Sequence, residues 1–330
     1  MRFLEGSMKQ ELIKFLVFAA AIFTAPVFFR GGYIVNVLVF VGIYTILAVA
    51  LNLLLGLAGQ ISLGQAAFFG LGAYISGVLT ATHAMNPWLA MVIAVIAVGI
   101  IAFVLGYPIL KLKGHYLAMA TLGMGIIVYI VFNETVDITG GPSGLSGIPN
   151  LSICGVIFNS DMKNYYLVWS FVIVTILLSV NLSQSRIGRA LRAIHDSEVA
   201  ARILGVNVRL LKVQVFTISG IFSALAGCLY AYTVQFISPA SFGFNVSIEL
   251  LTMVIIGGLG SIYGSFLGAA ILTLLPELFR SFQDYDIVVY GLVLIVMTMF
   301  MPGGLVRGIP LLARFLLAKA KAGFSSEKSV

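Results

Sequence analysis

Residues 33–57 read YIVNVLVFVGIYTILAVALNLLLGL, an apolar run that contains no charged side chain. A helix needs about 20 predominantly apolar residues to span the hydrocarbon core of a bilayer, so this stretch is long enough to cross a membrane. Further charge-free stretches occupy much of the chain, and the longest lies between Arg30 and Lys111. Only 9% of the residues are charged, whereas a soluble domain carries about 25%. A large soluble helical core would require charged faces that this chain lacks, and the pattern therefore predicts an all-α integral membrane protein.

The apolar runs predict a series of membrane helices and one interrupted segment. The predicted helices span residues 12–29, 33–57, 61–82, 88–110, 115–133, 164–182, 213–236 and 287–302. The first run is expected to remain as a helix, because the residues from Pro26 to Arg30 do not form the small-residue site at which a signal peptide is cleaved. The interrupted segment is 246–276, with four glycines near its midpoint.

Basic residues concentrate in two hydrophilic segments. The loop 183–212 and the tail 303–330 both carry more Lys and Arg than Asp and Glu. Cytoplasmic loops of membrane proteins have this excess, so both segments are predicted to be cytoplasmic. The formal net charge of +7 is then explained by orientation in the membrane, and no nucleic-acid partner is expected.

This orientation restricts how the segment 246–276 is arranged. The helix before it ends outside and the last helix must return inside, so the segment has to enter and leave on the same side. Its central glycines predict a broken helical hairpin with arms 246–257 and 261–276, and irregular backbone in a membrane must be buried in protein or line a cavity. About ten transmembrane or re-entrant helices result, in a single domain covering 1–330, with the N and C termini cytoplasmic. The Gly- and Pro-rich loop 134–163 is predicted to lie outside.

No constellation for catalysis or metal binding is recognisable. The sequence lacks the Walker A pattern that binds ATP phosphates, and the three histidines, His83, His115 and His195, are far apart along the chain. Cys154 and Cys228, the only cysteines, do not have metal-ligand spacing. We therefore expect no catalytic residue, no metal site and no cofactor bound by this chain.

Uncharged polar residues gather at the border between the predicted helices 33–57 and 61–82. One interpretation is helix packing, because small residues let backbones approach and amides or hydroxyls bond across helices. The other is a translocation path, because polar side chains at membrane depth usually face a bundle interior or an aqueous cavity. The stretch also weakly resembles 259–264, and paired glycine-interrupted segments in the two halves of a transporter indicate its path. The candidate path residues are Asn52, Gln60, Ser62, Gln65, Gly257, Gly258 and Gly260.

The loop 183–212 has the apolar spacing of a short amphipathic helix, with Gly205 as a stop signal. Such a helix can lie on anionic lipid headgroups, held by its arginines. It can equally be a docking helix for a partner protein. The physical properties of the loop do not decide between these two interpretations.

A resemblance to a known family favours docking. The pattern Ala200-Ala201-x-x-x-Gly205 resembles the EAA loop of ABC-importer permeases, although the family's Glu falls at Val199 here and Glu198 lies one position early. Four further stretches are similar to the branched-chain amino acid ABC permease family, M-type subunit. They are Gly59–Phe68, Gly114–Gly123, Thr139–Pro149 and Gly257–Gly264.

The resemblance implies a permease subunit of a bacterial-type inner membrane that couples to separate ATPases and has no catalytic activity itself. It implies a second homologous permease subunit, two ABC ATPase subunits that hold ATP and Mg, and an extracytoplasmic solute-binding protein, with membrane lipid around the chain. The residues expected to couple to the ATPase are Arg189, Arg192, Asp196, Glu198, Ala200, Ala201 and Gly205. Import of urea or short amides, a passive solute channel and a membrane enzyme remain alternatives.

Overall fold

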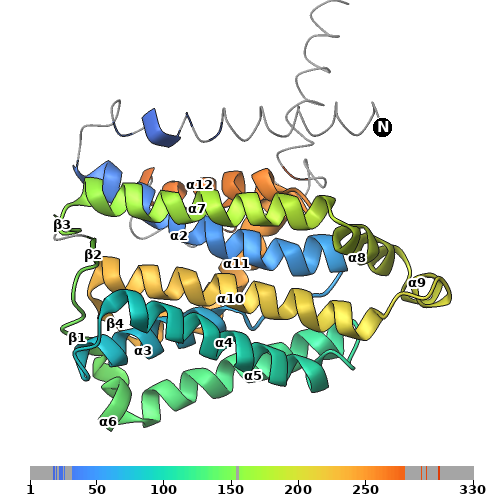
Figure 1. Cartoon of the computed structure of the whole chain (residues 1–330), viewed down its shortest axis with the longest axis horizontal. Helices are drawn as coiled ribbons and strands as arrows, with labels where there is room; N and C mark the ends of the chain where they lie inside the picture. Colours follow the sequence, from blue (N-terminus) through green and yellow to red (C-terminus); the bar gives the residue numbers. More distant parts are fainter. Residues whose placement is uncertain are drawn as a thin grey trace, which may run out of the picture.

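A computed structural model of the chain describes residues 32–153 and 156–278, together with residues 18, 20, 22–24, 26, 291, 295 and 304. The predicted helices 12–29 and 287–302 and the predicted tail 303–330 lie outside the described residues, apart from these isolated positions. The described elements are nearly all helices, and the long ones run side by side (Figure 1).

The long helices are α2 (Gly32–Asn52), α3 (Gln65–Ala81), α4 (Pro87–Ile109), α5 (His115–Glu134), α7 (Asp161–Gln184), α10 (Val208–Val234), α11 (Phe244–Gly257) and α12 (Ile262–Leu278). Six segments within the described residues have the length and hydropathy of membrane spans: Gly32–Leu57, Pro87–Ile109, His115–Glu134, Asp161–Gln184, Val208–Val234 and Pro239–Gly257. The expected all-α membrane fold is therefore confirmed.

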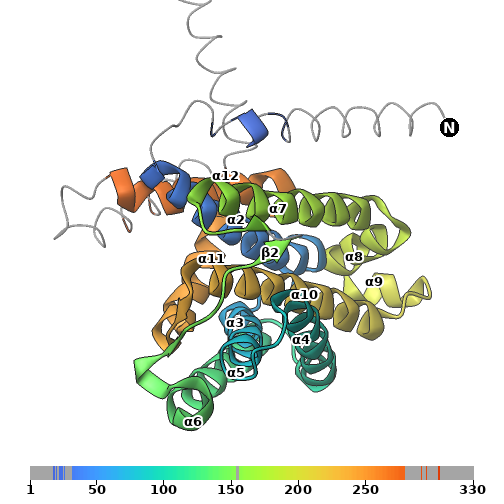
Figure 2. The same ribbon diagram turned by 60° about the vertical axis from the view of Figure 1, so that its left-hand side comes forward.

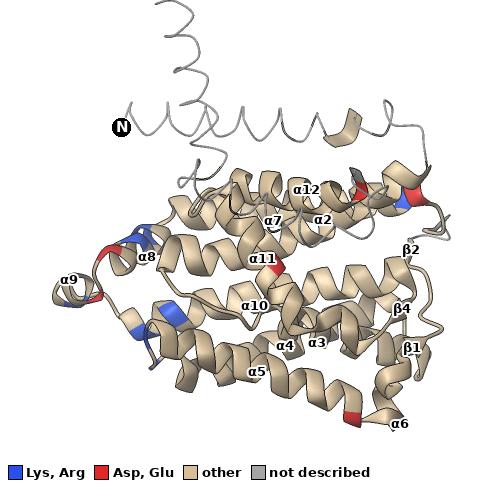
Figure 3. Cartoon of the chain, turned by 180° about the vertical axis from the view of Figure 1, so that it is seen from behind, with Lys and Arg blue, Asp and Glu red and all other residues tan. Residues whose placement is uncertain are grey.

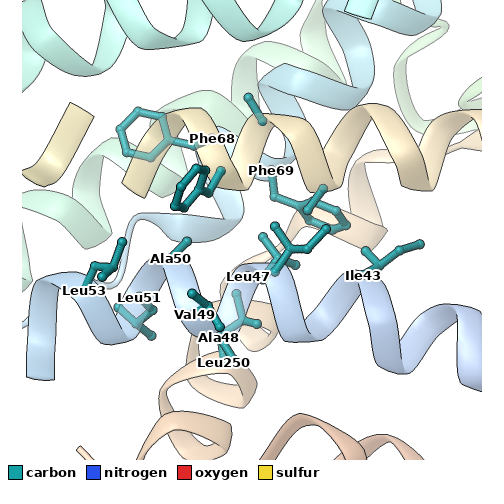
Figure 4. Packing of buried hydrophobic residues seen from close by; sticks show 14 of the residues in the cluster. Ile43, Leu47, Ala48, Val49, Ala50, Leu51, Leu53, Phe68, Phe69 and Leu250 are labelled. Carbon is teal, nitrogen blue, oxygen red and sulfur yellow. The ribbon is translucent and has the colours of Figure 1, made fainter. Parts of the chain in front are cut away.

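Helix α2 forms the centre of the bundle because it is apolar on every side, as a fully enclosed helix must be. It packs against α7, α10, α11 and α12, while α3 and α4 pack on the opposite side of α10 (Figure 2). Ile43, Leu47 and Leu51 of α2 are fully buried, and Phe68 and Phe69 of α3 pack into the same core (Figure 4). In contrast, α4 and α5 leave many large apolar side chains exposed, as helices facing lipid do.

The predicted helix 61–82 begins later than expected. After α2 the chain makes a π-helical turn, η1 (Leu53–Leu57), and residues 59–64 have no helical structure before α3 begins at Gln65. Gly59 has a positive φ of 65°, a conformation that glycine adopts without steric cost. The irregular segment thus places Gln60 and Ser62 in a loop instead of on a helix.

The predicted hairpin is present in the chain, with α11 and α12 separated at 258–261. The two helices are antiparallel, because a Cβ at Gly257 would collide with the carbonyl of Gly264, and one at Gly268 would collide with the carbonyl of Met253. Small residues at these contacts allow the two backbones to touch.

The position of this break differs from the prediction, which placed it midway through the membrane. The break contacts Gly56, and Gly59, three residues further on, lies against His195 of the loop 183–212. Three residues span at most about 11 Å, so the break lies near the end of the bundle that carries this loop. The glycine pattern located the break in sequence, but its depth depends on where α11 starts, directly after the 3-10 turn η3 (Pro239–Phe242), which packs against Gly70 and Tyr74 of α3.

Short elements close the opposite end of the bundle. They are α6 (Val136–Thr139), the 3-10 turn η2 (Gly141–Ser143), and the two-residue strands β1 (Leu145–Ser146), β2 (Ser152–Ile153), β3 (Val156–Ile157) and β4 (Phe236–Ile237). Strand β1 pairs with β4 and β2 with β3, both antiparallel. The loop 134–163 is thus structured, as its turn residues predicted. Figure 3 shows the positions of charged residues at the two ends of the described bundle, with an acidic position on α11 between them.

Candidate functional site

Asn52, at the end of α2, holds the break between α11 and α12. Its Oδ1 accepts a hydrogen bond of 2.8 Å from the Gly260 backbone N–H. Its Nδ2 donates to the Ser261 carbonyl at 2.9 Å and to the Ser265 hydroxyl at 2.7 Å, with the Gly258 carbonyl at 3.4 Å. Because backbone groups freed by a helix break are costly in a membrane unless they are paired, this one amide stabilises the break. We call these residues the Asn52 hub.

Glycines allow the hub to form. A Cβ at Gly56 would collide with Asn52 and with the backbone of Gly260, so only glycine fits between them. Gly258 and Gly260 have positive φ angles of 114° and 75°, which side chains other than glycine rarely adopt. The segments 52–65 and 257–264 therefore contact each other in the structure.

Gln65 makes a second buried polar network, on the α10 side of the core. Its Nε2 donates to the Ser219 hydroxyl at 2.9 Å, and its Oε1 accepts from the Ser223 hydroxyl at 2.7 Å. Ser219 in turn donates to the Ala50 carbonyl of α2 at 2.6 Å. The network joins α2, α3 and α10, and Gln65 is satisfied by these bonds.

Gln60 differs from its polar neighbours. Its side chain is only 2% exposed, and neither Oε1 nor Nε2 has a hydrogen-bond partner within the part of the chain that the structure describes. Ser62 is also buried, and its hydroxyl lies 3.4 Å from the Gly64 N–H that donates to it. A buried amide with no partner is costly, so Gln60 is the predicted path residue whose bonding capacity is unused.

The coupling loop contains two short helices, α8 (Arg186–Asp196) and α9 (Glu198–Ile203). Ser185 and Ser197 cap them by accepting hydrogen bonds from Gly188 N–H and Ala200 N–H. Both helices lie at one end of the bundle (Figure 1). Arg189 and Arg192 are exposed and bond within the loop, to the Gln184 carbonyl and the Ser183 hydroxyl. Asp196 is exposed at the end of α8.

Helix α9 presents apolar side chains outward. Val199, Ile203 and Leu204 are 68%, 80% and 79% exposed. Ala201 faces inward and is buried, Ala200 is exposed, and Gly205 follows with a positive φ of 80°. We call Val199, Ile203 and Leu204 the α9 apolar patch. The apolar spacing of the loop predicted a short amphipathic helix and small residues at the contact, but it did not indicate which apolar side chains stay exposed.

Glu198 bridges α9 to two membrane helices. Its Oε2 lies 3.2 Å from Nζ of Lys113, just before α5, and its Oε1 accepts a short hydrogen bond from Lys212 of α10. Partial burial acts to raise the pKa of Glu198, but hydrogen bonds and charge from Lys212 and Lys113 outweigh it and hold the pKa below its ordinary value of 4.5. The acid expected at an ATPase contact is therefore paired within its own chain.

We expect the Glu198 ion pairs to make folding stability depend on pH. A carboxyl whose pKa is lower in the folded state stabilises the fold above its unfolded pKa, and loses this contribution as pH falls through 4.5 and below. The variant Glu198→Gln should therefore unfold at a lower temperature than wild type at pH 7, with the difference shrinking at pH 4. Thermal unfolding of the purified protein measures this, with Asp196→Asn, an exposed carboxylate nearby, as a control that leaves stability unchanged. A difference that is the same at both pH values would contradict the assignment.

The coupling loop and the polar segment are in contact. A Cβ at Gly59 would lie 3.1 Å from Nδ1 of His195, in α8. Gly59 thus lies against α8, and Gly56, three residues earlier in the chain, lies against Asn52 and Gly260 of the hub. Among the described residues, no group of three His, Cys, Asp or Glu side chains gathers that could hold a metal ion.

The described chain is a multi-pass membrane bundle with a polar seam at a helix break and a short helical loop at one end. The chain belongs to the family described as "Branched-chain amino acid transport system / permease component", whose model matches residues 33–298. It is 34% identical over 326 residues to the high-affinity branched-chain amino acid transport system permease protein LivM of Escherichia coli (strain K12), covering 92% of this chain and 76% of that protein.

More distant relatives include both types of permease in this family. A probable LivM of Methanocaldococcus jannaschii is 24% identical over 84% of this chain and 94% of its own length. The permease protein LivH of Escherichia coli (strain K12) is 25% identical over 79% of this chain and 90% of its own length. No solved structure matches.

Proposed function

We propose that this chain is the transmembrane permease subunit of an ATP-driven importer for branched-chain amino acids, in a bacterial-type inner membrane. The observation that carries the proposal is the Asn52 hub, which joins two glycine-broken segments from the two halves of the chain. Broken segments of this kind form the path in many transporters. The chain itself is non-catalytic, and ATP and Mg are held by partner ATPases.

The assembly proposed here contains a second homologous permease subunit, two ATPases and an extracytoplasmic binding protein. Relatives named as both LivM and LivH support a pair of permeases. The α9 apolar patch supports ATPase docking, because exposed apolar patches on soluble surfaces mark protein contacts. The exposed residues Arg189, Arg192, Asp196, Ala200 and Gly205 lie in the same loop as this patch and are proposed as part of the same contact.

The path proposed here has few polar groups and no strongly binding charge. Asn52 and Gln65 are engaged in the structure, which leaves the buried Gln60 as the side chain whose amide can bond to a solute when the path opens. An amide can donate to a carboxylate and accept from an ammonium group, the two charged ends of an amino acid. Because such a lining has few polar groups and binds a solute weakly, it can release a solute that a separate binding protein delivers.

Replacing Gln60 by leucine separates a transport role from a structural one. Removing a buried polar group that has no partner should leave the unfolding temperature unchanged or raise it. If Gln60 contacts the solute, ATP-dependent leucine uptake by the reconstituted complex should fall about tenfold or more, as for loss of one hydrogen-bonding contact worth about 1.4 kcal/mol.

The matched control is Thr175→Val in α7, where the hydroxyl is also buried and has no hydrogen-bond partner among the described residues. This change should be neutral for both stability and uptake. Full uptake in the Gln60→Leu complex would remove Gln60 from the path.

The same reconstituted complex tests the class of transporter. Uptake that requires ATP and the ATPases supports an importer, and solute flux through the chain without ATPases would indicate a passive channel. Competition by excess urea or acetamide, with no competition by isoleucine or valine, would move the substrate class to urea or short amides.

The proposed topology places both termini and the loop 183–212 in the cytoplasm and the loop 134–163 outside. Ser146 is exposed in β1 of this outer loop, and Cys228 is buried. In a Cys154→Ser background, Ser146→Cys should react with an impermeant maleimide in intact spheroplasts. Ile203→Cys, exposed in α9, should react only after the membrane is opened. The reverse pattern would invert the topology.

A further inference from the structure

A groove at the edge of the bundle is not used by the path or by the α9 apolar patch. It has a volume of about 320 Å³, and its walls include Phe103 of α4, Leu182 of α7, Ile187 and Leu191 of α8, and Gln214 and Ile218 of α10. Helix α10 forms its floor, with α4 on one side and α7 and α8 on the other (Figure 2). We call this space the α4–α10 groove.

The interior of the groove is suited to a hydrocarbon chain. Apart from Gln214 and Thr217 the lining side chains are aliphatic or aromatic, and Thr217 donates its hydroxyl proton to the Val213 carbonyl of its own helix. Gln214 is exposed, so its amide is accessible to a bound molecule. Apolar walls favour an acyl chain because its burial removes apolar surface from contact with polar groups and water.

The rim of the groove is positively charged at the end where the helices reach α8. The Arg209 guanidinium lies 3.7 Å from the centre of the Tyr107 ring, and Tyr107 shares a helix face with Phe103, four residues before it. On the other side Arg186 directly precedes Ile187, and both arginines are exposed. A guanidinium offers a fork of donors that matches phosphate oxygens.

The nearby carboxylates do not neutralise this rim. Glu198 is bonded to Lys113 and Lys212, and Asp196 lies at the opposite end of α8 from Arg186. An apolar groove that opens between uncompensated arginines is complementary to a molecule with an acyl chain and an anionic headgroup.

We propose that the α4–α10 groove binds one anionic phospholipid. The acyl chain lies along Phe103 and Ile218, the phosphate lies between Arg209 and Arg186, and the Gln214 amide reaches the ester groups. Because its walls include α8 and α10, the bound lipid stabilises the position of the coupling loop against the membrane helices. Charge complementarity favours lipid over a second permease subunit as the occupant.

The first test measures lipid retained by the full chain, purified in detergent with its copurifying subunits. Native mass spectrometry after addition of equal amounts of dioleoyl phosphatidylglycerol and dioleoyl phosphatidylcholine should show at least a fivefold preference for the anionic lipid. The double variant Arg186→Gln/Arg209→Gln should lose this preference, and Arg202→Gln, an exposed arginine of α9, should keep it. Equal retention of the two lipids by wild type, or an unchanged preference in the double variant, would overturn the proposal.

The second test needs no loss of charge and identifies what occupies the groove. Phe103 is replaced by the photoreactive analogue p-benzoylphenylalanine, and Met119, exposed on α5, is replaced in a separate sample. After detergent exchange removes bulk lipid, the probe at position 103 should give an adduct with the mass of one phospholipid, and the probe at 119 should not. A cross-link from position 103 to a protein, or lipid adducts equal at both positions, would refute a specific lipid site.

Discussion

Replacing Asn52 by leucine is expected to cost about 3 kcal/mol or more of folding free energy and to abolish transport. Leucine has a similar size but cannot accept from the part-buried Gly260 N–H, and it also removes the bonds to the Ser265 hydroxyl and to the Ser261 carbonyl, which keeps the Ser265 N–H as its partner. A hydrogen bond contributes about 0.5–1.5 kcal/mol and an unpaired donor costs about 1–3 kcal/mol, so the loss of these three bonds together accounts for the expected cost. Thermal unfolding of the purified protein and uptake by the reconstituted complex measure the two effects.

Thr45→Val on the same helix is the matched control. Thr45 is also fully buried, but its hydroxyl donates only to the Val41 carbonyl one turn earlier. Its replacement should change stability by less than about 1 kcal/mol, because that carbonyl keeps its place in the helix. An Asn52→Leu variant as stable as the control would show that the hub does not hold the helix break.

Changing the α9 apolar patch to serine is expected to uncouple the chain from its ATPases without unfolding it. The three side chains Val199, Ile203 and Leu204 are largely exposed, so each change should alter stability by under about 0.5 kcal/mol. At a protein contact, truncation of buried apolar anchors costs about 2 kcal/mol or more. The triple variant should therefore insert normally, lose at least tenfold in ATPase copurification, and fail in ATP-dependent uptake.

Val136→Ser/Ile138→Ser is the control for this experiment. These two residues of α6 are also apolar and more than half exposed, but they lie at the opposite end of the bundle. The control should copurify with the ATPases as wild type does. If the α9 variant copurified equally well, the patch would not be the docking surface.

The sequence was sufficient to locate the polar seam, because side-chain amides and clustered glycines are restricted to few positions in membrane helices. Asn52 and Gly260 could be named before any contact was known, since uncharged polar groups in apolar helices need a partner or a cavity. Their partners were harder to predict. Ser261 and Ser265, and likewise Ser219 and Ser223, are spaced four residues apart and so share a helix face, but which face meets Asn52 or Gln65 depends on helix rotation.

The extent of the irregular segment and the depth of the break were not predictable for a related reason. Residues 61–64 are apolar enough to continue a helix, yet the π-helical turn and the positive φ of Gly59 end α2 and delay α3. Similarly, the exposed apolar face of α9 has the composition of a core helix. Composition alone does not distinguish a side chain that is buried within its own chain from one that contacts another protein.

The loop between Gly59 and Gly64 has a consequence for how motion could travel through this molecule. Helices α2 and α3 are stiffened by their own backbone ladders, but this loop is held by only a few bonds, among them the Gln60 N–H to the Leu54 carbonyl and the Leu63 N–H to the Thr121 hydroxyl. A helix transmits a displacement along its whole length, whereas a loop held by few hydrogen bonds can change conformation while its two ends stay fixed. A small tilt of α8 against Gly59 would then change the direction of the Gln60 amide, while helices α2 and α3 on either side of the loop stay in place.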